Sequence, residues 1–123
     1  MSSYMIITPT SINFSDKASI GSVSKAIGCT SLDTIPTLLG PSYIAYVDGN
    51  GMHKSDLVMN QLANPLISED WLIRLAHFGG PLGTIVITGE SGRLPLKKIQ
   101  KLYKDYDEDE PGWYPYLERA LME

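Results

Sequence analysis

The sequence predicts an α+β fold, a single small domain with a short, mostly antiparallel sheet and about three to five helices. Three observations lead to this prediction. Short runs that alternate or are rich in β-branched residues are interspersed with stretches that have the apolar spacing of helices. The segment Asp48-Gly49-Asn50-Gly51 follows an apolar run and is typical of a hairpin turn. The length of 123 residues fits one domain with its own core.

Two short strands are expected at the start of the chain. Tyr4 to Thr8 is apolar and β-branched, and Pro9 ends this run because proline lacks the N–H that a strand ladder needs. Residues 11–14 alternate polar and apolar side chains, which indicates a second strand at a sheet edge.

A helix is expected after these strands. Ser15 or Asp16 can cap its first turn. Its apolar face recurs at i, i+3 and i+7 and consists of Ile20, Val23 and Ile27. Gly28 follows at the position where glycine commonly ends a helix.

The middle of the chain favours strands again. Residues 31–35 alternate like a strand, but Pro36 restricts the next residues to an edge strand or a loop. Residues 43–47 are a stronger strand, and the turn at 48–51 predicts a short hairpin partner at 52–54.

Two helical segments are expected between residues 56 and 79. Residues 56–63 suit one or two helical turns that end before Pro65. Ser68 can cap a longer helix, which has Trp71 and Phe78 at the margins of its apolar face. The buried stripe of that helix consists of Leu72, Leu75 and Ala76.

The segment from Gly79 to Arg93 contains the clearest strand of the chain. Residues 84–88 carry no charge and are all β-branched, which predicts a central strand buried on both faces. A helix is expected from Pro95 to about residue 106. The single domain, residues 1–123, would then end with an acidic linker at about 107–111 and a short aromatic helix at 113–122.

The order of these features resembles the DUF3846 family of small phage and mobile-element proteins. The resemblance covers about residues 4–90 and rests on four segments: Ala26-Ile27-Gly28, Tyr46-Val47-Asp48-Gly49-Asn50-Gly51, Asn60 to Asn64, and Gly83-Thr84-Ile85-Val86-Ile87-Thr88-Gly89. It implies an accessory protein of a phage or similar element that is expressed in a bacterial cytoplasm. It implies no catalytic or binding residue, because the family has no established chemistry.

The composition narrows the function classes. Ten basic and fourteen acidic residues give a formal net charge of −4, which argues against a nucleic-acid partner despite the lysines of 97–104. The single cysteine, Cys29, excludes an internal disulfide. No signal peptide or membrane-spanning run is recognisable, so a cytoplasmic location without membrane contact is expected.

One candidate binding site follows from the glycine-rich turn after the central strand. Ser91, Gly92 and Arg93 precede a helix, where free N–H groups and an arginine can hold an anion such as a phosphate. Arg74, Trp113 and Tyr114 are further candidates, for phosphate and for a stacked base. The competing interpretation, which is favoured, is a tight turn that only needs glycine for its geometry.

No catalytic or metal-binding signature is present, and no cofactor is expected. Cys29, His53 and His77 lack the spacing of a nucleophile–base pair or of metal ligands. The acidic run 105–110 lacks the glycine and the offsets of a calcium loop. Five aromatic residues lie in the last fifth of the chain: Tyr103, Tyr106, Trp113, Tyr114 and Tyr116. They could stack on bases, but core and interface anchors are the favoured interpretation. Because the aromatic residues of the tail are hard to bury in so small a domain, a homo-oligomer interface is expected.

These observations favour a non-catalytic, phage-type anti-defence protein that acts by stoichiometric binding. In one version it sequesters a nucleotide-derived signalling molecule at an oligomer interface. In another it docks on a host defence protein as an inhibitor. A small nucleotide-processing enzyme is the alternative from a different class, and it would need a catalytic group that only the fold could assemble.

Overall fold

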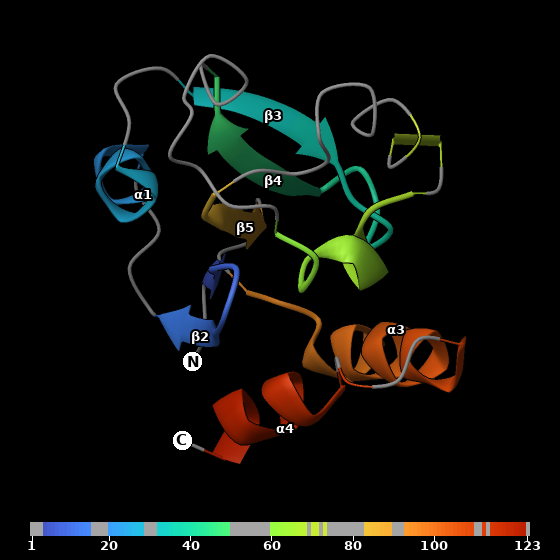
Figure 1. Ribbon diagram of the computed structural model, residues 1–123. Helices are drawn as coiled ribbons and strands as arrows, with labels where there is room; N and C mark the ends of the chain where they lie inside the picture. Colours follow the sequence, from blue (N-terminus) through green and yellow to red (C-terminus); the bar gives the residue numbers. More distant parts are fainter. Residues whose placement is uncertain are drawn as a thin grey trace.

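The computed structural model describes residues 4–15, 20–28, 32–49, 60–68, 70–71, 73, 83–89, 93–109, 112 and 114–122. They form one small α+β domain, as predicted (Figure 1). Its elements in chain order are β1 (Tyr4–Ile7), β2 (Ile12–Ser15), α1 (Ile20–Ile27), β3 (Leu32–Pro36), β4 (Tyr43–Asp48), the 3-10 helix η2 (Asn64–Leu66), β5 (Ile85–Gly89), α3 (Leu96–Asp109) and α4 (Tyr114–Met122).

The five strands form a single antiparallel sheet in the order β2-β1-β5-β4-β3. The predicted central strand is confirmed, because β5 lies in the middle between β1 and β4. Its residues Ile85, Val86 and Ile87 are fully buried. Since successive side chains of a strand point to opposite faces, both faces of the sheet must be covered at β5.

Helices cover the two faces unequally (Figure 1). On one face, α1 contributes Val23 to a small cluster with Tyr4 and Val86. On the other face, η2, α3 and α4 bury Ile85 and Ile87 in the main core. The predicted helix at α1 is confirmed at its end as well: Gly28 adopts a φ of 78°, and its N–H donates to the Ser24 carbonyl at 2.8 Å.

Three local predictions need correction. Pro65 does not end a helix; it lies in the first turn of η2, where its missing N–H removes no helical bond. Residues 60 and 61 are not helical. Helix α3 continues to Asp109, so 107–109 form its last turn rather than a linker, and the Asp107 carboxylate accepts the Gly112 N–H at 2.6 Å.

The hairpin partner expected at 52–54 lies outside the described residues. Within the described part, β4 pairs with β3 and β5. The helix expected after Ser68 is seen at residues 70, 71 and 73, and the Trp71 N–H donates to the Ser68 hydroxyl at 3.4 Å, as expected of a cap. No helix in the described ranges is long and apolar enough to cross a bilayer.

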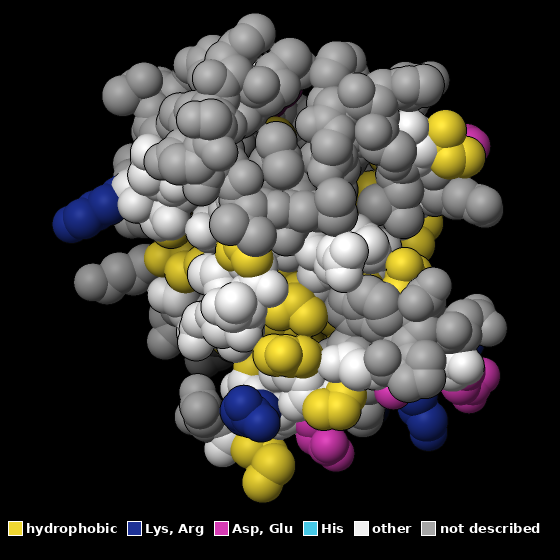
Figure 2. Space-filling view, viewed as in Figure 1, with side chains coloured by type: hydrophobic (Ala, Val, Ile, Leu, Met, Phe, Trp, Pro, Cys, Tyr) yellow, Lys and Arg dark blue, Asp and Glu magenta, His cyan; other side chains and the backbone are white. Residues whose placement is uncertain are grey.

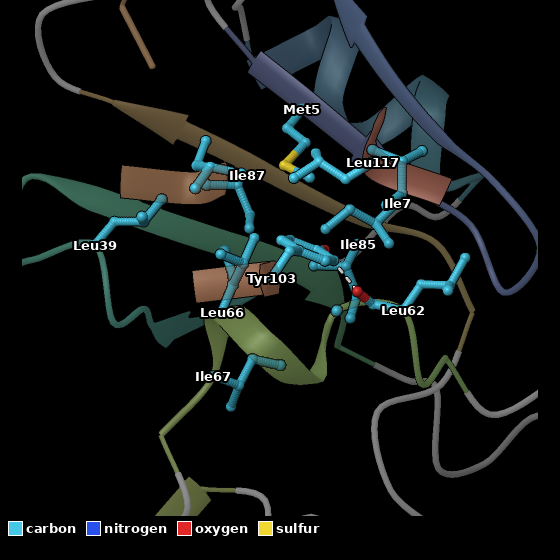
Figure 3. Close-up of a cluster of buried hydrophobic side chains, with 14 of the residues drawn as sticks. Met5, Ile7, Leu39, Leu62, Leu66, Ile67, Ile85, Ile87, Tyr103 and Leu117 are labelled. Carbon is cyan, nitrogen blue, oxygen red and sulfur yellow. Dashed lines mark hydrogen bonds between the residues drawn. The ribbon is translucent and has the colours of Figure 1, made fainter. Parts of the chain in front are cut away.

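Tyr103, one of the aromatic residues expected to be core or interface anchors, is completely buried in the core. Its side chain lies between α3, η2 and the sheet, among the core residues drawn in Figure 3. The hydroxyl donates to the Leu62 carbonyl at 2.6 Å, so the polar end of the ring is satisfied. Burial raises the pKa of Tyr103 far above its ordinary value. Tyr116, in contrast, is exposed on α4.

Candidate functional site

The candidate site lies at one end of the sheet, where three strand ends meet the start of α3. Pro36 at the end of β3 pairs with Ile44 of β4, and Tyr43 at the start of β4 pairs with Gly89 at the end of β5. The loop of residues 37–42 and the chain that follows β5 therefore emerge side by side.

Hydrogen bonds fix this loop to the rest of the domain. The Thr37 hydroxyl donates to the Tyr43 carbonyl at 3.1 Å and accepts the Leu39 N–H at 3.2 Å. The Lys98 ammonium donates to the Leu39 carbonyl at 3.2 Å. Because Lys98 belongs to the first turns of α3, the loop and the start of this helix hold each other in place.

A hollow of about 270 Å³ opens beside the loop. Most of its wall is apolar, and it is lined by Thr34, Ile35, Pro36, Gly40, Pro41, Tyr43 and Ile44. Pockets of this character bind flat apolar groups and rely on a few polar groups nearby for orientation. The first cationic residue after β5 in the sequence is Arg93, four residues after Gly89.

Gly89 brings Tyr43 and Arg93 together. A Cβ atom added at Gly89 would lie 2.7 Å from Cε1 of the Tyr43 ring and 3.0 Å from the Arg93 carbonyl oxygen. The ring and the Arg93 backbone thus flank the same glycine, which supports the interpretation that this turn needs glycine for packing. The Arg93 side chain is exposed and has no partner within the described residues.

Replacing Gly89 by alanine is expected to lower the free energy of unfolding by about 1 to 3 kcal/mol, because the added methyl group overlaps the Tyr43 ring. Urea denaturation followed by circular dichroism measures this change. In a Tyr43→Ala background the same substitution should cost less, since the ring is gone. If Gly89→Ala lowers the free energy of unfolding equally in the wild-type and Tyr43→Ala backgrounds, the Tyr43 ring does not pack against Gly89.

The charges of α3 run against its dipole. Its first turn has no acidic residue and its last turn no basic one, while Lys97 and Lys98 are exposed at the start and Asp105 and Glu108 near the end. Each such placement costs about 0.3 to 1 kcal/mol relative to the favourable order. The start of α3 therefore concentrates positive charge, which suits an anionic ligand.

Among the predicted site residues, only Arg93 and Tyr114 fall within the described part of the chain. Ser91, Gly92, Arg74 and Trp113 lie outside it. Tyr114 begins α4, after the 14 residues of α3. Helix α4 packs against α3.

The aromatic ring at this end of the sheet is that of Tyr43, which the sequence-based site did not include. The strand pairing that places Tyr43 opposite Gly89 joins residues far apart in the chain. A glycine after a buried strand is the only sequence signal for such a contact, since aromatic rings often pack on glycine across a strand pair.

Comparisons with known proteins add no family to this description. No protein-family model, no curated protein and no solved structure matches the chain. Among the described residues, no group of three or more His, Cys, Asp or Glu side chains lies together in a way that could hold a metal ion.

Proposed function

We propose that this chain is a non-catalytic, phage-type anti-defence protein that sequesters a nucleotide-derived signalling molecule by stoichiometric binding. The observation that carries the proposal is the apolar hollow lined by Tyr43, whose ring flanks Gly89 together with the Arg93 backbone. The first turn of α3, which follows Arg93 in the chain, has no acidic residue. The hollow would take the base or a similar ring, and the cations would take a phosphate.

Each residue at this end has a distinct role in the proposal. Arg93 is exposed and without a described partner, so its guanidinium is available for bidentate phosphate binding. Lys97 adds a second charge at the helix start. Ser91 and Gly92, which precede Arg93, would offer backbone N–H groups to the same anion.

The setting is part of the same proposal. A DUF3846-like accessory protein of a phage would act in the bacterial cytoplasm, where its target signal is produced. We further propose that it is a homo-oligomer and that Arg74, Trp113 or Tyr114 of one subunit complete the site of another.

Docking on a host defence protein is the second candidate. The observation that favours it is the exposed acidic surface at the end of α3, which includes Asp105 and Glu108. Clustered exposed carboxylates attract a basic partner surface and accelerate the encounter. Recovery of one host protein in a pulldown, together with its loss in an Asp105→Lys, Glu108→Lys variant, would support this version.

Titration calorimetry with cyclic nucleotides and ADP-ribose derivatives tests the sequestration proposal. Binding of at least one of these ligands is expected, and Arg93→Glu should weaken it by about 10- to 100-fold because a charged hydrogen bond is lost. Lys97→Glu should weaken it as well. Lys104→Glu is the matched control, since it lies on the same helix about 10 Å further from the site.

Two outcomes would contradict this proposal. One is the absence of binding to the whole panel, and the other is an Arg93→Glu affinity equal to that of Lys104→Glu. Ligand recovered unchanged after heat release supports sequestration, whereas a chemically altered ligand supports the nucleotide-processing enzyme.

A further inference from the structure

The two edges of the sheet differ in how they are protected against pairing with another strand. At the β3 edge, Pro36 has no N–H to offer, and the Thr34 N–H is already bonded to the Asp33 carboxylate at 2.9 Å. Proline and charged residues are devices that keep an edge strand from extending a sheet. The β3 edge is therefore closed.

Among the residues that the structure describes, the β2 edge has none of these devices. Residues 12–15 contain no proline and no charge. The Thr8 N–H donates to the Ser11 carbonyl at 2.9 Å, so Thr8 and Ser11 form a hydrogen-bonded pair. Because such pairs alternate along an antiparallel ladder, the N–H and C=O groups of Ile12 and Phe14 point away from β1, toward the open side.

Helix α4 lies beside this open edge (Figure 1). A hollow of about 110 Å³ lies where α4 packs against β2. It is lined by Thr10, Ser11, Ile12 and Asn13 from the β2 side and by Tyr116, Arg119 and Ala120 from α4. Tyr116 is 40% exposed and Met122 is 85% exposed, both unusually high for large apolar side chains. Figure 2 shows apolar side chains gathered over this part of the surface.

We propose that the β2 edge and α4 together form the interface with a second copy of this chain. The two β2 strands would pair antiparallel about a two-fold axis at Asn13 and join the two sheets into one. In this register Ile12 of each copy pairs with Phe14 of the other, with about four main-chain hydrogen bonds that use every outward-pointing group of both residues. This inference assigns one interface of the homo-oligomer and rests only on the oligomeric part of the proposed function. Because β2 and β3 are opposite edges of the sheet, this interface does not bring α4 of the second copy to the hollow beside β3 and β4.

A second copy fits this surface because the surface is complementary to itself. The two-fold axis would place both α4 helices on the same face of the joined sheet, where the exposed Tyr116 and Met122 of each copy become covered. Glu118 and Arg119 are adjacent on α4, and neither has an ion-pair partner within the described residues. Across a two-fold axis each can pair with the opposite charge of the other copy.

The oligomeric state of the full chain tests the inference. Native mass spectrometry and light scattering should detect a dimer of the purified protein. Asn13→Lys should raise the dimer dissociation constant by about fivefold or more, because two lysines would face each other across the axis. Thr34→Lys is the matched control: it places the same charge on the closed β3 edge and should leave the dimer unchanged.

Charge reversal on α4 supplies a second, independent readout. Glu118→Arg and Arg119→Glu should each weaken the dimer, and the double variant should restore it. A monomeric wild type would overturn the inference, and so would a dimer that Asn13→Lys and Thr34→Lys affect equally. Ligand binding by a monomeric protein would overturn the interface alone, whereas a dimer that binds no ligand would overturn only the sequestration proposal.

Discussion

Replacing Tyr103 by alanine is expected to lower the free energy of unfolding by about 3 to 5 kcal/mol. Tyr103 is the largest of the fully buried side chains, and its ring fills the space between α3, η2 and the sheet. Removing the side chain leaves a cavity. It also leaves the buried Leu62 carbonyl without a hydrogen-bond donor. Since small domains are stable by only about 5 to 15 kcal/mol, urea denaturation should show a large fall in the unfolding midpoint.

Tyr103→Phe separates the ring from the hydroxyl. This variant keeps the packing but leaves the Leu62 carbonyl unpaired, so a smaller loss of about 1 to 3 kcal/mol is expected near neutral pH. Because burial raises the pKa of Tyr103 in the folded state, the neutral phenol stabilises the fold below the unfolded-state pKa of about 10. That contribution is lost as the pH rises further.

The difference between wild type and Tyr103→Phe should therefore narrow above about pH 10. Denaturation curves of both proteins between neutral and alkaline pH measure it. If the difference in unfolding free energy between wild type and Tyr103→Phe stays constant with pH, the pKa of the phenol is not raised by burial. If neither Tyr103→Ala nor Tyr103→Phe lowers the stability, Tyr103 does not lie in the core.

The features predicted correctly are those with signals inside a single segment. The run of β-branched residues at 84–88 is enough to indicate a strand buried on both faces, and β5 is the central strand. The periodic apolar residues of α1 and the terminal Gly28 indicate a helix and its end in the same local way. Such signals do not depend on which strands become neighbours.

The features that sequence reasoning misses depend on contacts between distant segments. The sequence alone leaves open whether Tyr103 is a core or an interface anchor, because its burial requires η2 and the sheet, which lie far from it in the chain. It also places the candidate site around Arg93 without Tyr43, because the pairing of β4 with β5 has no local signal. Register and burial across elements are decided by the whole fold, so a single sequence constrains them weakly.

Asn60 is the clearest case of such a long-range contact. Its side chain is fully buried, and its amide nitrogen donates to the carbonyls of Ile7 and Gly83, each at 2.8 Å. Ile7 ends β1, and Gly83 precedes β5 at a φ of 71°. Because β1 and β5 are neighbours in the sheet, the Asn60 amide holds together the ends of two central strands that the chain separates widely.

Replacing Asn60 by aspartate should be more damaging than replacing it by alanine. Alanine leaves two buried carbonyls without donors, at a cost of about 2 to 4 kcal/mol. The carboxylate has nearly the same shape but points oxygen atoms and a charge at those carbonyls, so a loss above about 4 kcal/mol is expected at neutral pH. Burial and the two carbonyls raise the pKa of the new carboxyl. The protonated form is therefore favoured in the folded state, and the loss should shrink as the pH falls toward about 4.

Asn64→Ala is the matched control for this comparison. Asn64 belongs to the same segment, and the buried amide oxygens of Asn60 and Asn64 both have no partner within the described residues. The two differ in that no hydrogen bond of the Asn64 side chain is seen within the described residues. Its removal should change the free energy of unfolding by less than about 1 kcal/mol. Urea denaturation of the three variants at pH 4 and pH 7 decides the matter: if Asn60→Asp is no less stable than Asn60→Ala at neutral pH, the two carbonyls are not held by the Asn60 amide.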